Sequence, residues 1–155
     1  MGTRSLTFVY DEHNEAIINL YRQYNGYPEL HGRELANFLL PRIIVNDIQD
    51  ETDDIANGMS CLAVQLIAHF STAGQGAGFH IHSVSDRDCG QDYEYHVHKD
   101  RVVVKHYCER VGLLARQREL FSGDWENFSR YCTACAGWHR GRRTEHADRS
   151  EALDK

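Results

Sequence analysis

The strongest pattern in the sequence is one long amphipathic helix, expected from about residue 52 to about residue 70. Its apolar side chains recur at steps of four, three, four and four residues, which places them on a single helix face. These side chains belong to Ile55, Met59, Leu62, Leu66 and Phe70. A stripe of this kind has to be covered by another element, so the rest of the chain must supply a packing surface.

Short segments with the two-residue alternation of β-strands lie on both sides of this helix. Residues 4–10 and 17–24 predict an N-terminal hairpin. Residues 79–82, 92–98 and 102–107 predict three later strands. A sheet built from these strands would offer one face to the helix.

The pairing of the N-terminal strands decides which side chains share a face. We expect Tyr10 to lie opposite Ile18. That register places three side chains of interest at one end of one face, namely Arg4, Arg22 and Tyr24.

The later hairpin has a clearer register. A two-residue turn at Lys99-Asp100 pairs His96 with Val103 and Glu94 with Lys105. The opposite side of these strands is mostly apolar. We therefore expect one face to pack on helices and the other to meet water or a ligand.

Other segments are expected to be helical. Pro28 is well placed as the first residue of a helix that Pro41 ends. Residues 109–120 have the composition of a polar helix. Ser122 can cap a last short helix that runs to about Cys132.

The predicted fold class is α+β. We expect a mainly antiparallel sheet, made of the N-terminal hairpin and three later strands, packed on two helices and followed by a short C-terminal helix. Residues 1–132 are expected to form a single domain. Residues 133–155 are rich in charged side chains and predict a polar, disordered tail.

The charge balance excludes one class of function. The chain carries 17 basic and 23 acidic side chains, a formal net charge of −6. This excludes a general nucleic-acid binder held by phosphate attraction. No apolar run approaches the roughly 18 residues of a membrane span, and five cysteines without a signal peptide fit a reducing cytosol. We expect a cytoplasmic protein with no membrane partner.

Two pairs of histidines stand out among the ten in the chain. His80 and His82 are two residues apart in one predicted strand, and His96 and His98 in another, so each pair points to one side. If those strands are neighbours, four imidazoles form a patch that suits a zinc ion or a phosphate. The same spacing also fits a solvated strand face, so these alternatives stay open.

The segment from residue 24 to residue 32 is a second candidate site. Two tyrosines offer flat faces for a base, and three arginines offer forks for phosphate. They are Tyr24, Tyr27, Arg4, Arg22 and Arg33. The helix start at Pro28 adds backbone donors. Gly32 is costly inside a helix, by about 1 kcal/mol against alanine, and close approach of another group would explain it. Plain helix capping with two packed tyrosines is the alternative.

Cysteine spacing provides a third candidate. Cys132 and Cys135 have the Cys-x-x-Cys spacing of zinc ligands, and His139 and His146 follow them. The usual arm of about 12 residues between the two halves of a zinc finger is missing. The alternative is that Cys132 simply ends a helix.

Several segments also resemble a known group of proteins. They are Met1-Gly-Thr-Arg-Ser-Leu6, Tyr21-Arg-Gln-Tyr-Asn-Gly-Tyr-Pro28 with His31-Gly32, Asn57-Gly-Met59 and Asp92-Tyr-Glu-Tyr95. Together they resemble a family of small proteins carried by bacteriophages and large DNA viruses, from Met1 to about Cys132. Asn25 departs from the aspartate that this family tends to have. The resemblance implies a viral origin and a place in the cytoplasm of an infected host cell.

A viral origin suggests a function by analogy. In its size, its arginine–tyrosine loop and its lack of a nucleophile motif, the chain is similar to phage anti-defence proteins that sequester cyclic nucleotide or cyclic ADP-ribose signals. We expect a non-enzymatic, homo-oligomeric binder of a small phosphorylated ligand. The predicted ligand-binding residues are Arg4, Arg22, Tyr24, Asn25, Tyr27, His31, Arg33, His96 and His98.

Two other functions remain alternatives. A phosphoesterase or metal-dependent hydrolase would use the strand histidines, His80, His82, His96 and His98, to cleave such a signal. A protein-binding inhibitor would use the acidic segment from Asp47 to Asp54 to dock on a basic host factor.

Overall fold

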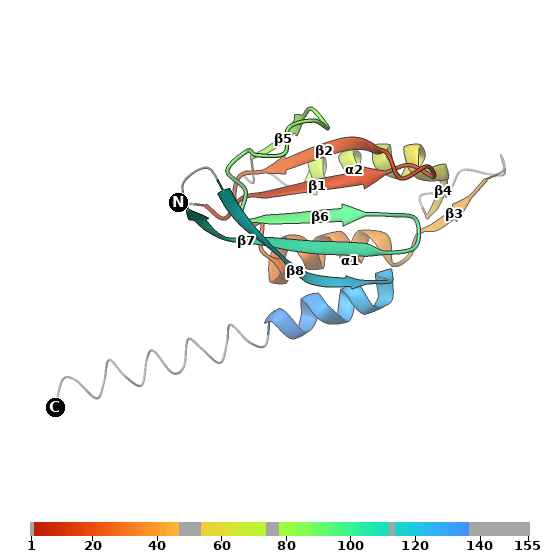
Figure 1. The fold of residues 1–155 in the computed structure, drawn as a ribbon. Coiled ribbons are helices and arrows are strands. Elements are labelled where there is room, and N and C mark those ends of the chain that lie inside the picture. The colour runs from red at the N-terminus through yellow and green to blue at the C-terminus, as the bar shows by residue number, and fades with distance from the viewer. Residues whose placement is uncertain (1, 47–53, 74–77, 112–113, 137–155) are drawn as a thin grey trace.

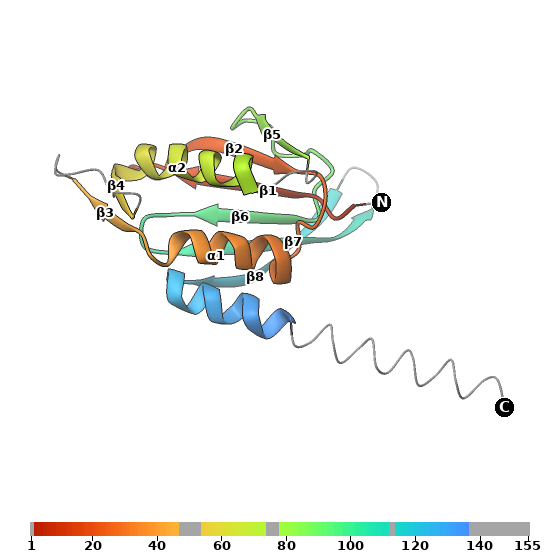
Figure 2. The same cartoon turned by 180° about the vertical axis from the view of Figure 1, so that it is seen from behind.

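The computed structural model describes residues 2–46, 54–73, 78–111 and 114–136. It confirms the α+β class. A six-stranded sheet has its helices on one face, as the two opposite views show (Figures 1 and 2).

The sheet has the strand order β5-β2-β1-β6-β7-β8. Its strands are β1 (Ser5–Tyr10), β2 (Ala16–Arg22), β5 (Phe79–His82), β6 (Tyr93–Val97), β7 (Val102–Val111) and β8 (Leu114–Gly123). All neighbours are antiparallel except β1 and β6, which are parallel. A separate parallel pair consists of β3 (Ile43–Val45) and β4 (Ile55–Asn57).

The helices supply the other half of the core. A π-helical turn, η1 (Pro28–Gly32), leads into α1 (Arg33–Leu39), and α2 (Gly58–Ala73) follows β4. A C-terminal helix spans residues 125–136. The predicted stripe of α2 is buried at Met59, Leu62, Leu66 and Phe70.

The expected helix at residues 109–120 is wrong. Its described residues, 109–111 and 114–120, belong to β7 and β8, which pair with each other along the edge of the sheet. The sheet therefore has four later strands and not three. Good helix formers fill this segment, but pairing with a neighbouring strand overrides a helix preference of a few tenths of a kcal/mol per residue.

The expected register of the N-terminal hairpin is also wrong, by one residue. Val9 pairs with Ile18 and Ser5 with Arg22, and a β-bulge lies between Val9 and Tyr10. A slip of one residue exchanges the two faces of a strand. Arg22 therefore lies on the face that the helices cover, together with Ser5 and Val9.

The register of the β6–β7 hairpin is confirmed. His96 pairs with Val103 and Glu94 with Lys105. The amide of His98 donates to the carbonyl of Arg101 across the expected turn. The opposite face of these strands is buried against the helices, at Tyr95, Val97, Val102 and Val104.

Two helix starts differ from expectation. Helix α2 begins at Gly58 and not near residue 52, because residues 55–57 form β4 and the carboxylate of Glu12 accepts a hydrogen bond from the amide of Met59 (2.7 Å). Asp124, and not Ser122, caps the C-terminal helix, since its carboxylate accepts from the amide of Asn127 (2.8 Å).

The C-terminal helix continues to residue 136, so both cysteines of the Cys-x-x-Cys spacing lie within it. The predicted tail beyond that point lies outside the described residues, as does the acidic segment apart from Asp54. Within the described ranges, no helix combines the length and apolarity needed to cross a membrane.

Candidate functional site

Arg22 and His31, two of the predicted ligand-binding residues, form a network inside the core. Nη1 of Arg22 donates to Nδ1 of His31 (3.0 Å) and to the carboxylate of Glu34 (2.6 Å). Nε of Arg22 donates to the carbonyl oxygen of Tyr24 (2.7 Å). Because a guanidinium can only donate, Nδ1 of His31 accepts, and Nε2 carries the proton toward the hydroxyl of Thr7 (2.7 Å).

His31 is an uncharged link in this network. Its side chain is fully buried among the rings of Phe70, Phe79 and Tyr95. Burial, reinforced by the positive charge of Arg22, holds the pKa of His31 well below its usual value. The network joins the sheet, through Thr7 and Arg22, to His31 in η1 and Glu34 in α1.

The side chains of the other residues of the predicted loop site lie outside this buried network. Tyr24, Asn25 and Arg33 are exposed and Tyr27 is half-buried. Arg4 precedes Ser5 and so lies on the opposite side of the sheet from Arg22. A Cβ added at Gly90 would lie 2.9 Å from Nη1 of Arg4, which places that guanidinium against the loop before β6. The observed register therefore separates Arg4 from Arg22, which the sequence analysis placed on one face.

Gly32 does mark a close approach, and the approaching group belongs to the chain itself. A Cβ at this position would lie 2.7 Å from Sγ of Cys132 in the C-terminal helix. Burial raises the pKa of the Cys132 thiol, and Tyr95 lies nearby at 3.5 Å from the same Cβ position. Cys132 is therefore a packing residue in this structure.

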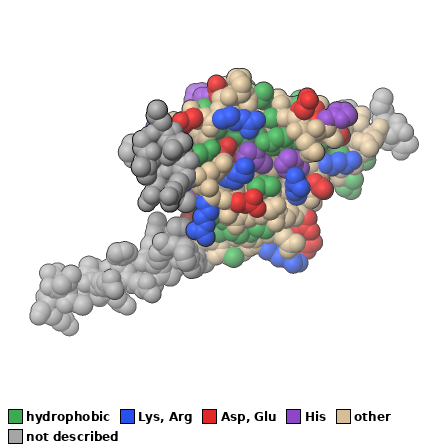
Figure 3. Space-filling view, in the orientation of Figure 1, with side chains coloured by type: hydrophobic (Ala, Val, Ile, Leu, Met, Phe, Trp, Pro, Cys, Tyr) green, Lys and Arg blue, Asp and Glu red, His purple; other side chains and the backbone are tan. Residues whose placement is uncertain are grey.

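The four strand histidines share one face of the sheet but do not form one patch. We call this the helix-free face; it carries Leu6, Phe8, His82 and His96 and lies opposite the helices (Figures 1 and 3). Strands β1 and β2 separate β5 from β6. His82 and His96 consequently lie about 14 Å apart, at roughly 4.8 Å for each strand crossed.

His96 is held in a buried aromatic setting. Its ring stacks on Phe8, with centroids 5.2 Å apart, and its Nδ1 shares a hydrogen bond of 2.6 Å with the hydroxyl of Tyr10. Its Nε2 is buried without a hydrogen-bond partner among the described residues, 3.7 Å from the carboxylate of Glu94. Burial and the positive charges of Lys105 and Arg87 lower the pKa of His96 to about 3, so the ring is neutral.

His98 extends this group toward solvent. Its ring stacks on Tyr10 with centroids 4.3 Å apart, and its Nδ1 has no hydrogen-bond partner within the described part of the chain. Partial burial and the charge of Arg101 lower the pKa of His98. Histidines near the middle of this face thus have arginine and lysine side chains around them (Figure 3).

Buried Glu94 is fixed on the same face by two neighbours. Its carboxylate accepts a hydrogen bond from Gln117 (2.7 Å), whose amide also reaches the hydroxyl of Tyr107 (3.3 Å). Burial, and then the hydrogen bond to Glu94, raise the pKa of Tyr107. Lys105 lies directly across from Glu94 in the next strand.

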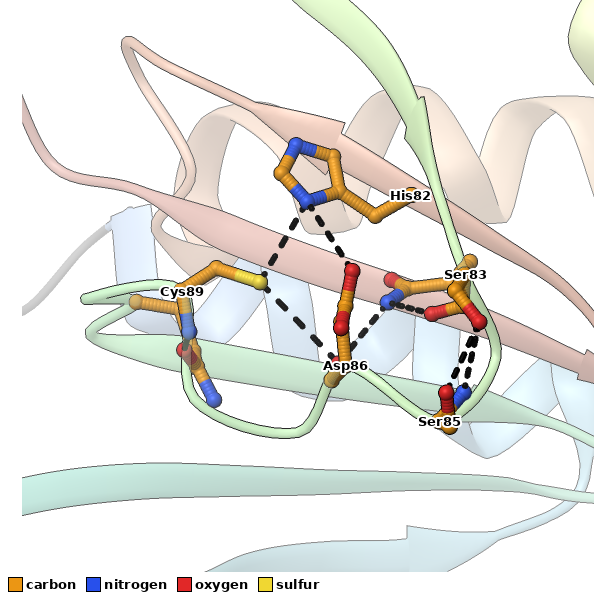
Figure 4. A network of polar contacts seen from close by, with 7 residues as sticks. His82, Ser83, Ser85, Asp86 and Cys89 are labelled. Carbon is orange, nitrogen blue, oxygen red and sulfur yellow. Dashed lines mark hydrogen bonds and ion pairs between the residues drawn. The ribbon is translucent and has the colours of Figure 1, made fainter.

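A second group of polar side chains lies on the other side of the loop that joins β5 to β6. An open pocket of about 590 Å³ is lined by Tyr21, His80, His82, Asp86, Asp88 and Cys89. Nδ1 of His82 lies 3.5 Å from Sγ of Cys89 and 3.9 Å from the carboxylate of Asp86 (Figure 4). Among the described residues, no three side chains of metal-ligating type already surround one point.

The 83–92 loop contributes to both groups of side chains in a way that the sequence does not predict. This segment has no hydrophobic periodicity, so nothing in its sequence predicts that it crosses the helix-free face. It places the guanidinium of Arg87 over the ring of Phe8, 4.3 Å from the centroid, and brings Cys89 to His82.

The chain was compared with models of protein families, with curated proteins and with solved structures, and none of them matches it.

Proposed function

We propose that the protein binds a small phosphorylated ligand on the helix-free face and leaves it chemically unchanged. The observation that carries the proposal is the stack of His98 on Tyr10 inside a group of positive charges, where the buried Nδ1 of His98 lacks a hydrogen-bond partner among the described residues. A flat ring system suits a base, and guanidinium groups suit phosphate oxygens.

The cations come from separate segments of the chain. Arg87 belongs to the loop over the sheet, Arg101 to the β6–β7 turn and Lys105 to β7, while Arg4 precedes β1. The positive charges of Arg87 and Lys105 lower the pKa of His96, and that of Arg101 lowers the pKa of His98. This spacing favours a ligand with more than one phosphate, or with a phosphate and a base. The resemblance of the N-terminal motifs to viral proteins leads us to propose a cyclic nucleotide or cyclic ADP-ribose signal of the host.

The site chemistry favours binding over cleavage. His96 is neutral at any pH near 7 because its pKa is about 3, and its Nδ1 is already bonded to Tyr10. The two histidine pairs are too far apart to act as one acid–base couple on a single phosphate. Burial and nearby carboxylates raise the pKa of Cys89, so its thiol is a poor nucleophile.

An open sheet face buries little of a small ligand by itself. We therefore expect a second copy of the chain to close over this face, with the ligand between the two copies.

Isothermal calorimetry against cyclic dinucleotides, cyclic trinucleotides and cyclic ADP-ribose isomers tests the proposal. We expect at least one of these ligands to bind. Arg87→Ala and Arg101→Ala should each weaken that binding by roughly ten- to a hundredfold, since both side chains are exposed and each would lose a charged contact. Arg130→Ala, which removes an exposed cation from the C-terminal helix, is the matched control and should leave affinity unchanged.

The fate of the ligand separates the alternatives. Heating the complex and analysing the released ligand should return it intact. A linear or hydrolysed product would establish the phosphoesterase alternative. Failure of every ligand in the panel to bind, with folded protein, would contradict the proposed function.

A further inference from the structure

The pocket on the other side of the 83–92 loop holds donor groups of a different kind. Its cysteine, histidine and aspartate side chains point toward one another from β5 and the loop that follows it (Figure 4). We propose that Cys89, His82 and Asp86 bind a single divalent ion of the zinc class. This site is separate from the proposed phosphate site, and neither depends on the other.

The contact between Cys89 and His82 already has the geometry of a ligand pair. The sulfur and the ring nitrogen face each other across one hydrogen bond, in which either atom can hold the proton, depending on the tautomer of His82. The two atoms are 3.5 Å apart. Around a tetrahedral zinc ion, bonds of about 2.3 Å to sulfur and about 2.0–2.1 Å to nitrogen separate these atoms by roughly 3.5 Å. Replacing the proton by the ion therefore requires little movement.

Asp86 supplies the third ligand. Its Oδ2 lies 3.9 Å from the same nitrogen, and its side chain is about half exposed. In the described chain, three such ligands do not surround one point, so the carboxylate of Asp86 has to rotate toward the ion. The exposure of this side chain to solvent leaves room for that rotation. The pocket is open, so water completes the coordination shell.

The surroundings of the pocket favour a cation. The carboxylates of Asp86 and Asp88 line the pocket together with Cys89, and that of Glu94 adds to the negative charge around the thiol. A bound divalent ion offsets this negative potential and stabilises the thiolate. On binding, the sulfur–hydrogen bond breaks, the sulfur–metal bond forms and the proton passes to solvent.

The donor set also indicates which ions bind. Thiolate and imidazole ligands favour zinc and similar transition-metal ions, whereas magnesium and calcium prefer all-oxygen sites. Tyr21 packs its ring against both His80 and His82, with centroids 6.0 and 4.9 Å away, and so limits how far the ligand ring can turn.

Titration of the full chain with Co²⁺, followed by its thiolate charge-transfer absorption, tests the site. We expect one equivalent to bind, and Zn²⁺ but not Mg²⁺ to displace it. Cys89→Ser should abolish the thiolate band. Asp86→Asn, at an exposed position, should weaken metal binding at least about tenfold. Even the loss of an outer-shell partner of a metal ligand typically lowers metal affinity 10- to 100-fold.

Matched cysteine variants decide between this site and the Cys-x-x-Cys segment. Cys135→Ser and Cys61→Ser should keep the band, because neither thiol lies in the pocket. A band that survives Cys89→Ser, or that disappears in Cys135→Ser, would overturn the proposal. If Cys89→Ser fails to fold, proton release decides: Zn²⁺ should release about one proton from the wild-type chain and less from His82→Ala.

Discussion

At the scale of single residues, the most unexpected feature is a polar network on the helix side of the sheet. Arg22, His31 and Thr7 occupy positions that hydrocarbon side chains usually fill. Each hydrogen bond in this network has a defined direction because the guanidinium can only donate. The same property makes the network sensitive to protonation, since a charged His31 would have no acceptor for Arg22.

The stability of the protein should therefore fall as the pH is lowered from 6.5. His31 and His96 both have folded-state pKa values below the usual 6.5, so the unfolded chain binds more protons. Their contribution is complete above pH 6.5 and is lost as the pH falls toward the folded values, at about 1.4 kcal/mol per pH unit for each group. Urea denaturation at pH 7.5, 6.0 and 5.0 measures this slope.

A variant of His96 measures how much this residue contributes to the dependence of stability on pH. His96→Asn removes one of the histidines whose pKa is lowered by burial, so the loss of stability per pH unit should shrink by up to about 1.4 kcal/mol. Val64→Asn, at an exposed position of α2 that carries no titratable group, is the control and should keep the wild-type slope. A wild-type stability that stays constant between pH 6.5 and 5 would contradict the buried neutral state of both histidines.

Gly32 provides a prediction about packing. Gly32→Ala should destabilise the protein by about 1–3 kcal/mol, because the new methyl group would overlap Sγ of Cys132. The helical preference of alanine, about 1 kcal/mol, offsets only part of this cost.

The double variant identifies the cause. Combining Gly32→Ala with Cys132→Ala should recover part of the loss, since the smaller side chain leaves room for the methyl group. Chemical denaturation of both single variants and the double variant completes the cycle. Strict additivity would mean that the two positions do not contact each other.

At the scale of elements, two helices begin where a carboxylate accepts a hydrogen bond from the first helical turn. The local sequence does not show which carboxylate or hydroxyl does so. Glu12, in the turn of the N-terminal hairpin, accepts from the first turn of α2 and has a pKa lowered by that hydrogen bond. Ser122 and Asp124 are both good capping residues, and only Asp124 bonds to the C-terminal helix. Ser122 belongs instead to β8, opposite Val103.

Alanine variants of Asp124 and Ser122 test which residue caps the C-terminal helix. Asp124→Ala should lower the free energy of unfolding by about 0.5–2 kcal/mol, the usual cost of losing a helix cap. Ser122→Ala should change it by less than about 0.5 kcal/mol, as for most exposed positions. Thermal denaturation of both variants is sufficient, and equal effects would show that the helix begins elsewhere.

At the scale of the whole molecule, the two faces of the sheet have different tasks. One face packs on the helices and contains the main core. The other is crossed by the 83–92 loop, which buries Leu6 and Phe8 in a smaller cluster with Tyr21. The same loop carries Arg87, which lies over the ring of Phe8, and Cys89, which lines the pocket with His82.

The expected closure of the helix-free face by a second copy is a prediction about this scale. Light scattering coupled to size exclusion should give a mass at least twice the 17.9 kDa of one chain. Val103→Asp, next to His96 on this face, should shift the protein toward monomer by placing a charge in the interface. Val64→Asp, on the exposed side of α2, should not. A wild-type monomer that binds its ligand tightly would contradict the closure.

Periodicity within the sequence determined the elements that bury one face. The stripe of α2 and the β6–β7 hairpin follow from local spacing, because each has one clearly apolar side and the turn at Lys99 fixes the register. These features suffice for the α+β class. The helix-free position of His96 and His98 follows from the same register.

Only the tertiary structure decided the rest. Strand β1 is buried on both faces, so alternation alone could not orient it, and a one-residue register difference moved Arg22 into the core and Arg4 to the other side. Residues 109–111 and 114–120 form strands because pairing along the sheet edge outweighs weak helix propensity. The contact between Cys89 and His82 depends on the path of an aperiodic loop across the sheet, and local sequence carries no signal for such a path.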